Sequence, residues 1–193
     1  MSALLNTTNE AEGLPRRRFT FEEVEEMTRL GILREDERIE LIGGEIVPMS
    51  PKGGLHEVLK TALNLYWAQR LPTDLLFTTE TTFRLSRDTY LEPDFVFYPE
   101  AGGWRGLNAE SARLVVEIAD SSLAYDLGRK SRLYAGFGIA ELWVINAASR
   151  EARIHREPGP EGYRLVADKA ASDRLVPHRA PGFTVTLSEL TLR

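Results

Sequence analysis

The sequence predicts a mixed α/β fold of the α+β kind, in which helices flank a mixed sheet rich in antiparallel strands. Apolar side chains recur every three or four residues from Leu55 to Arg70, which indicates an amphipathic helix. After Pro72 the period changes to two, and short strand candidates follow, separated by polar turns. The order of helix, hairpin, helix, strands, helix, strands is typical of a mixed domain with few helices.

The first elements carry start and stop signals. Thr20 and Glu23 have the spacing of a capping box, and the helix that they begin ends at Gly31. The apolar run from Ile39 to Val47 is interrupted by Gly43-Gly44, which predicts a hairpin with a glycine turn.

The rest of the chain alternates between strand candidates and one more helix. Ser121 or Ser122 can cap a helix through Phe137, with glycines at 136 and 138 to end it. A final hairpin is expected across Pro158-Gly159-Pro160. The strand candidates, which are short apolar or alternating runs, cover residues 76–78, 82–85, 95–98, 113–118, 141–145, 153–156 and 163–166.

Length and composition favour one folded domain. The 193 residues fit a single domain, which we place at residues 19–193, and 42% of them are hydrophobic. Residues 1–18 show no apolar periodicity and end in three arginines, so we expect them to form a flexible arm. The lack of cysteine excludes a disulfide scaffold, a thiolate-bound metal and a thiol nucleophile.

The charge and hydropathy of the chain limit its partners. A net charge of −5 repels phosphate backbones overall, so a nucleic-acid partner has to use a local patch. No apolar run reaches the ~18 residues that span a bilayer, and the polar, acidic start does not resemble a signal peptide. We therefore expect a cytoplasmic protein that has no membrane partner.

Two acids stand where a buried core is expected. Asp94 opens the apolar run from Phe95 to Phe97, and Glu117 interrupts the apolar strand candidate 113–118. A buried carboxylate costs several kcal/mol unless a partner or a metal compensates its charge. A hard cation such as Mg²⁺ is one explanation, because it prefers oxygen ligands. The alternative is structural: Asp94 caps a turn, and Glu117 pairs with a cation such as Lys130 or Arg113.

The helix after this strand presents three polar side chains on one face. Asp126, Lys130 and Tyr134 are spaced at i, i+4 and i+8. A strand that leads directly into a helix folds back across it, so Lys130 is expected near Glu117. There it could orient a metal-bound water or stabilise charge in a transition state. The alternative is a surface ion pair between Asp126 and Lys130, worth a few tenths of a kcal/mol.

Taken together, these segments resemble the bacterial Uma2 family of "putative restriction endonucleases", which is similar to the PD-(D/E)xK nuclease superfamily. The resemblance covers about residues 20 to 160. It rests on Arg38-Ile39-Glu40-Leu41-Ile42-Gly43-Gly44-Glu45-Ile46, His56, Glu92-Pro93-Asp94, Val115-Val116-Glu117-Ile118-Ala119-Asp120-Ser121-Ser122, Asp126-Leu127-Gly128-Arg129-Lys130, Tyr134 and Gly138-Ile139-Ala140-Glu141-Leu142-Trp143.

The resemblance implies a restriction-endonuclease-like core and a metal-dependent nuclease site. Asp94 matches the first, metal-binding acid, and Glu117 matches the second acid, so both are expected to bind Mg²⁺ or Mn²⁺. Two residues after Glu117 the superfamily has lysine, whereas this chain has Ala119. The family pattern moves the lysine to the helix, here Lys130. The expected catalytic residues are therefore Asp94, Glu117 and Lys130.

Further side chains are expected to support the site. By its place in the family pattern Glu40 could reach the same metal, or it could serve as a surface or turn partner. His56 could contact substrate phosphate or transfer protons, or act only at the start of its helix. Asp126 and Tyr134 are expected beside Lys130. Glu80 is a weaker candidate ligand and is expected to be exposed.

Two functions follow for the whole chain. The first is a Mg²⁺- or Mn²⁺-dependent endonuclease that hydrolyses phosphodiester bonds, with DNA as the expected substrate. The rival is an inactive nuclease-like fold that binds nucleic acid or protein, because a fold by itself does not determine function. A homodimer is expected, since cutting both strands of a duplex calls for two active sites. Trp104 and Phe183 are apolar residues outside the predicted core elements.

Overall fold

The computed structural model describes residues 17–192, and they divide into two compact units. Residues 17–50 and 82–92 form the smaller unit, and residues 51–81 and 93–192 form the larger one. The sequence predicts one domain over residues 19–193. It gives no sign of this division, because the return of residues 82–92 to the first unit depends on strand pairing between distant segments. Residues 1–16 of the expected arm lie outside the described residues.

The smaller unit consists of one helix and a four-stranded antiparallel sheet in the order β2-β1-β5-β4. Helix α1 (Phe21–Arg29) has the predicted capping box at Thr20 and Glu23. The predicted hairpin is also confirmed, and its turn residues Gly43 and Gly44 have φ of 60° and 82°, which favours glycine. The strands are β1 (Ile39–Ile42), β2 (Glu45–Pro48), β4 (Phe83–Ser86) and β5 (Thr89–Leu91).

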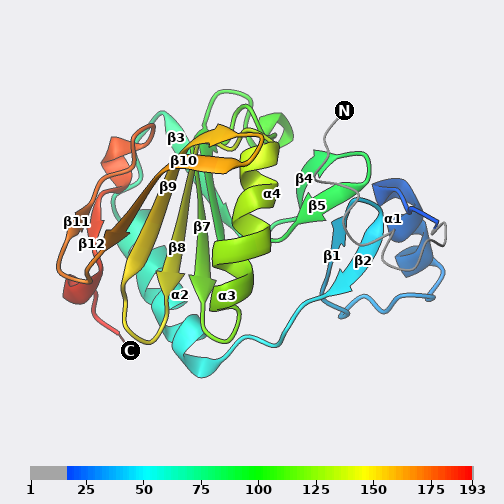
Figure 1. The fold of residues 1–193 in the computed structure, drawn as a ribbon, viewed down its shortest axis with the longest axis horizontal. Coiled ribbons are helices and arrows are strands. Elements are labelled where there is room, and N and C mark those ends of the chain that lie inside the picture. Colours follow the sequence, from blue (N-terminus) through cyan, green and yellow to red (C-terminus); the bar gives the residue numbers. More distant parts are fainter. Residues whose placement is uncertain (1–16, 193) are drawn as a thin grey trace. The chain divides into compact units, whose positions relative to one another are not determined.

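The larger unit is built on a six-stranded sheet in the order β10-β9-β8-β7-β6-β3 (Figure 1). All neighbours are antiparallel except the parallel pair β7 and β8, so the predicted mixed sheet is confirmed. The strands are β3 (Leu75–Thr79), β6 (Phe95–Pro99), β7 (Leu114–Ala119), β8 (Glu141–Asn146), β9 (Ala152–Gly159) and β10 (Gly162–Lys169). A separate pair, β11 (Arg174–Leu175) and β12 (Val185–Thr186), precedes the end of the chain.

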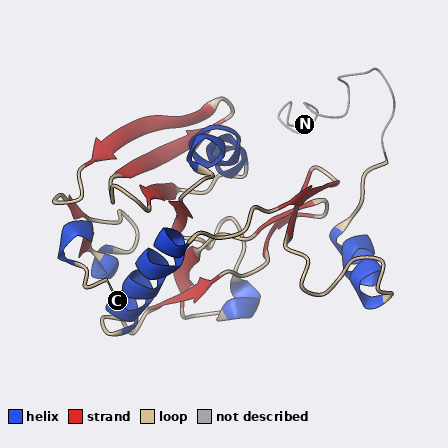
Figure 2. Ribbon diagram, turned by 90° about the horizontal axis from the view of Figure 1, so that it is seen from below, coloured by secondary structure: helices blue, strands red, loops and turns tan. Residues whose placement is uncertain are grey.

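Helix α2 (Gly54–Ala68) confirms the amphipathic pattern and covers one face of the six-stranded sheet, while α3 and α4 lie on the other (Figures 1 and 2). Trp67 is fully buried, and its ring meets the rings of Phe95 and Phe97 edge to face at 5.0 Å. Its Nε1 donates a hydrogen bond to the carbonyl oxygen of Phe183 at 3.0 Å. Phe183 lies outside the predicted core elements but is fully buried in the core, so it offers no exposed apolar surface for a dimer contact.

The helix predicted from Ser121 or Ser122 to Phe137 is interrupted. It consists of α3 (Leu123–Tyr125), a π-helical turn (Asp126–Lys130) and α4 (Ser131–Gly136). A π-helical turn widens the helix, so the spacing of i, i+4 and i+8 no longer defines one regular face. Such turns are common at functional sites, and this one carries Asp126 and Lys130. None of the helices in residues 17–192 combines the length and the hydrophobicity that a bilayer span requires.

Candidate active site

Asp94 directly precedes β6, and Glu117 lies in the neighbouring strand β7. Phe95 is paired with Val116, and continuing this antiparallel register by one residue brings Asp94 opposite Glu117. The backbone N–H of Ile118, the next residue, donates to Asp94 Oδ2 at 2.7 Å. Both carboxylates are buried, with 4% of each residue exposed. The two acids that the sequence singled out are therefore brought together by strand pairing.

Two side chains, one just before α2 and one in its first turn, hold the other oxygen of Asp94. Lys52 Nζ and His56 Nε2 each lie 2.9 Å from Asp94 Oδ1. Burial alone would raise the pKa of Asp94, but the hydrogen bond and charge of His56, the charge of Lys52 and the Ile118 N–H together lower it to about 2. Asp94 is therefore an anion near neutral pH.

Glu117 has its own cation. Lys130 Nζ lies 2.9 Å from Glu117 Oε1, and the hydroxyl of Tyr134 donates to the same oxygen at 2.6 Å. All three residues are buried. The expected approach of Lys130 to Glu117 is confirmed, and Tyr134 joins it. This contact agrees with the catalytic hypothesis and equally with the structural alternative in which Glu117 pairs with Lys130.

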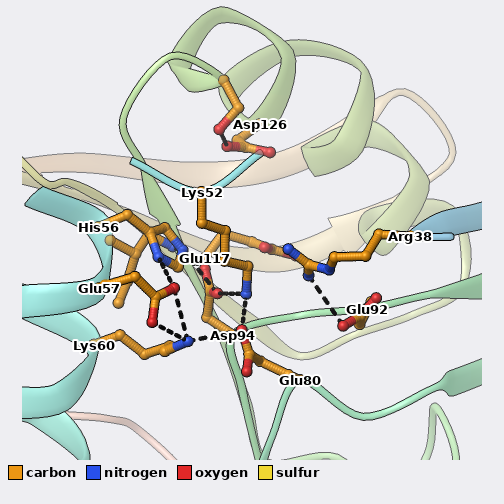
Figure 3. Close-up of polar contacts among 12 residues, drawn as sticks. Arg38, Lys52, His56, Glu57, Lys60, Glu80, Glu92, Asp94, Glu117 and Asp126 are labelled. Atoms are coloured by element: carbon orange, nitrogen blue, oxygen red, sulfur yellow. Dashed lines mark hydrogen bonds and ion pairs between the residues drawn. The ribbon is translucent and has the colours of Figure 1, made fainter. Parts of the chain in front are cut away.

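A second group of charges continues from Asp94 toward solvent (Figure 3). Lys52 also pairs with Glu80, and Lys60 Nζ reaches both Glu80 Oε1 and Glu57 Oε2 at 2.8 Å. Glu80 is exposed, as the sequence predicts, although two lysines bind it and its side chain keeps 35% of its surface in solvent. Its φ of 49° is rare for a residue with a side chain and costs of order 1–3 kcal/mol.

Lys52 and Lys60 are the site residues that the sequence reasoning missed. Lys60 follows His56 by four residues, so the two share one face of α2, which is a signal that the sequence does contain. Lys52 precedes the N-cap Gly53 and carries no such pattern. Only the fold brings it to Asp94, which is 42 residues away.

Gly53 allows a further acid to approach α2. A Cβ atom at this position would collide with Oδ2 of Asp120, which directly follows β7. Glycine therefore lets the Asp120 carboxylate lie against the N-terminal end of the helix, where the helix dipole favours negative charge. Neither residue was a site candidate from the sequence.

The remaining candidates have other partners. Asp126 Oδ2 accepts a hydrogen bond from Ser122 Oγ at 2.5 Å, and Asp126 is buried. His56 Nδ1 lies 3.2 Å from Glu57 Oε1, in addition to its contact with Asp94. Glu40 belongs to the smaller unit, where its Oε1 accepts from the Glu92 N–H at 3.1 Å. Its expected contact with the metal stays a prediction.

The donor set suits a hard divalent ion. Mg²⁺ is commonly held by one or two carboxylates together with waters, and Asp94 and Glu117 offer such a pair. Among residues 17–192 no group of three or more histidine or carboxylate side chains is placed to hold a metal. Because Lys52, His56 and Lys130 already contact these carboxylates, they would have to share or release carboxylate oxygens to a bound metal.

Known proteins place the chain in a family. The family model Uma2, described as "Putative restriction endonuclease", matches residues 21–189. A solved structure from Anabaena variabilis ATCC 29413, described as a "putative nuclease belonging to DUF820", has a TM-score of 0.61 and 16% sequence identity, covering 89% of this chain and 96% of that one. This likeness confirms the mixed, restriction-endonuclease-like fold. None of the curated proteins matches the chain. Because the family model spans most of the sequence, the protein belongs to the Uma2 family of "putative restriction endonucleases".

Proposed function

We propose that this protein is a metal-dependent endonuclease that hydrolyses phosphodiester bonds, with Mg²⁺ or Mn²⁺ as cofactor and DNA as substrate. One observation carries the proposal: Asp94, directly before β6, lies opposite Glu117 of β7, both acids are buried, and each is held by separate cationic or hydrogen-bonding groups. A protein that needed only a stable core would lose little by replacing such buried pairs with apolar side chains. A buried acid with a perturbed pKa, such as Asp94, is more typical of functional sites.

Each group has a role in this chemistry. Asp94 and Glu117 would hold the metal, which supplies charge neutralisation at phosphate and a bound water of lowered pKa. Lys130 is held against Glu117, which would place its ammonium beside a bound metal, where it would stabilise negative charge that develops in the transition state. Tyr134 orients Glu117 through its hydroxyl.

Side chains at and just before the start of α2 form a local cationic patch. A nucleic-acid partner needs such a patch, because the net charge of the chain is negative. Lys52, His56 and Lys60 lie side by side near Asp94, whereas the chain as a whole carries a net charge of −5 (Figure 3). Cations concentrated at one place can bind backbone phosphates that the rest of the molecule repels. A substrate phosphate can compete with Glu80 for Lys52 and Lys60.

The rival function is a nuclease-like binding module without catalysis. The ion pairs of Asp94 and Glu117 support it, because they compensate the buried charges without any metal. The two functions differ in one respect that can be measured, which is turnover.

The test is cleavage of supercoiled plasmid and of short single strands with Mg²⁺ or Mn²⁺. Wild type is expected to cleave, and Asp94→Asn is expected to be inactive, because it removes a ligand charge and few atoms. Asp36→Asn is the matched control, since Asp36 lies exposed at the surface of the smaller unit and pairs only with Arg34 among the contacts described. Equal cleavage by wild type and Asp94→Asn would refute the site, and metal binding without any cleavage would favour the binding module.

A further inference from the structure

Strand β10 forms an open edge of the six-stranded sheet. It pairs with β9 only, and no backbone hydrogen bond joins its outer side to another segment within residues 17–192. Its five central residues are exposed, and Leu165 and Val166 keep 52% and 51% of their surface in solvent. An eight-residue edge that exposes backbone groups and apolar side chains is a template for a further strand.

The sequence of β10 is complementary to itself in one register. In a strand, only every second residue directs its backbone N–H and C=O groups toward a given neighbour. Two identical antiparallel strands can therefore pair only in registers that place one residue opposite its own copy, and the twofold axis passes between these two copies. With the axis at Val166, this residue faces its own copy, Leu165 faces Ala167, and Arg164 faces Asp168. With the axis at Leu165 or Ala167, neither Arg164 nor Asp168 meets an opposite charge.

Both charged side chains are exposed at this edge. The Arg164 side chain is 73% exposed, and its Nε lies 3.8 Å from Glu157 Oε2. Asp168 is 74% exposed, and the guanidinium of Arg153 on β9 holds its carboxylate through two hydrogen bonds of 2.6 and 3.1 Å. Arg153 therefore orients Asp168 at the edge of the sheet. The twofold symmetry repeats the contact between Arg164 and Asp168, so it occurs twice in the dimer. Opposite charges directly across from one another stabilise two paired strands.

We infer that two copies of this chain associate through antiparallel pairing of their β10 strands, with Val166 on the twofold axis and Arg164 of each copy opposite Asp168 of the other. The two six-stranded sheets then form one continuous sheet of twelve strands. The pairing covers the open edge and buries part of the exposed surface of Leu165 and Val166 against the neighbouring strand. The inference is independent of catalysis, because none of these residues belongs to the candidate active site.

Charge variants test the register. Light scattering of wild type is expected to give twice the chain mass of 21.7 kDa. Arg164→Asp and Asp168→Arg each place like charges opposite one another, so each alone is expected to raise the dimer Kd by about tenfold or more. An equimolar mixture of the two variants restores both opposite-charge contacts and is expected to form heterodimers. A monomeric wild type at high concentration, or a mixture that associates no better than the single variants, would overturn the inference.

A cross-link provides a second test that does not depend on weakening the dimer. The chain has no cysteine, so Val166→Cys introduces a unique thiol that meets its own copy at the axis. Mild oxidation is expected to give a disulfide-linked dimer on a non-reducing gel. Val176→Cys is the matched control, because Val176 is 45% exposed and lies outside β10. Equal cross-linking of the two variants would contradict the proposed axis, whatever the oligomeric state.

Discussion

Lys130 Nζ lies 2.9 Å from Glu117 Oε1, and only about 5% of either side chain is exposed. A buried ion pair of this kind contributes little net stability, because the cost of removing both charges from water offsets their attraction. Removal of one partner is a different matter, since the other charge then remains buried without compensation. The pair therefore makes separate predictions for stability and for catalysis.

For stability, Lys130→Met is expected to lower the free energy of unfolding by about 3 kcal/mol. The methionine keeps the length and apolar stem of lysine but leaves the Glu117 carboxylate without its cation. Addition of Glu117→Gln is expected to recover much of this loss, because the double variant buries no charge at this position. Urea denaturation at neutral pH measures both values, and equal stability of wild type and Lys130→Met would show that the pair is more hydrated than the structure indicates.

For catalysis, Lys130→Met is expected to keep metal binding and to lower kcat about 100-fold. A cation that acts on the transition state affects turnover more than ground-state binding. Single-turnover cleavage and metal titration of the same preparation separate the two effects. Parallel loss of metal affinity and turnover would show that Lys130 organises the metal site instead.

Gly53 is expected to be intolerant of a side chain. Gly53→Ala forces its Cβ against the Asp120 carboxylate, and we expect a loss of about 1–3 kcal/mol in the free energy of unfolding. Gly54→Ala is the matched control, because nothing lies within 4 Å of its added Cβ and alanine favours the helix. Chemical denaturation of both variants is the measurement, and a neutral Gly53→Ala would mean that Asp120 moves away without cost.

His155 is expected to make the fold sensitive to acid. Burial, and then the charge of Arg153, lower its pKa to about 4, and no hydrogen-bond partner within residues 17–192 reaches its Nε2. A folded-state pKa below the unfolded value of about 6.5 favours the neutral ring in the folded protein. The stability that this group contributes is therefore present above pH 6.5 and is lost as the pH falls from about 6.5 to about 4.

Between about pH 6.5 and about pH 4, the contribution of His155 to the free energy of unfolding is expected to fall by roughly 2 kcal/mol, after allowance for partial hydration of the ring. His155→Phe keeps an aromatic ring of similar size and removes the titrating group, so the free energy of unfolding is expected to vary less over this pH range. Urea denaturation of both proteins at pH 7, 5.5 and 4.5 is the measurement. Identical pH profiles would show that other groups dominate the acid response.

Local sequence signals predicted most of the elements. The capping box of Thr20 and Glu23, the Gly43-Gly44 turn and the apolar period of α2 all depend on neighbouring residues, and all three are confirmed. The π-helical turn Asp126–Lys130 was not predicted, because spacing alone does not distinguish it from a regular helix. Lys52 was missed for another reason, since its contact with Asp94 exists only after distant segments pack together.

The pairing of Asp94 with Glu117 was anticipated from burial and not from geometry. Both acids stand in apolar runs, so burial of their negative charges requires a cation, hydrogen bonds or a metal as partner. The strand order brings the two acids near each other, because β6 lies directly beside β7 in the sheet. The sequence predicts the chemical need for partners, and the fold supplies Lys52, His56 and Lys130 to meet it.

The most direct test of the metal site is calorimetric titration of Mg²⁺ and Mn²⁺ into wild type, Asp94→Asn and Asp36→Asn at neutral pH. The proposal predicts one site per chain in wild type and in Asp36→Asn, and an affinity lowered about tenfold or more in Asp94→Asn. Metal binding that Asp94→Asn leaves unchanged would place the ion elsewhere and contradict the account.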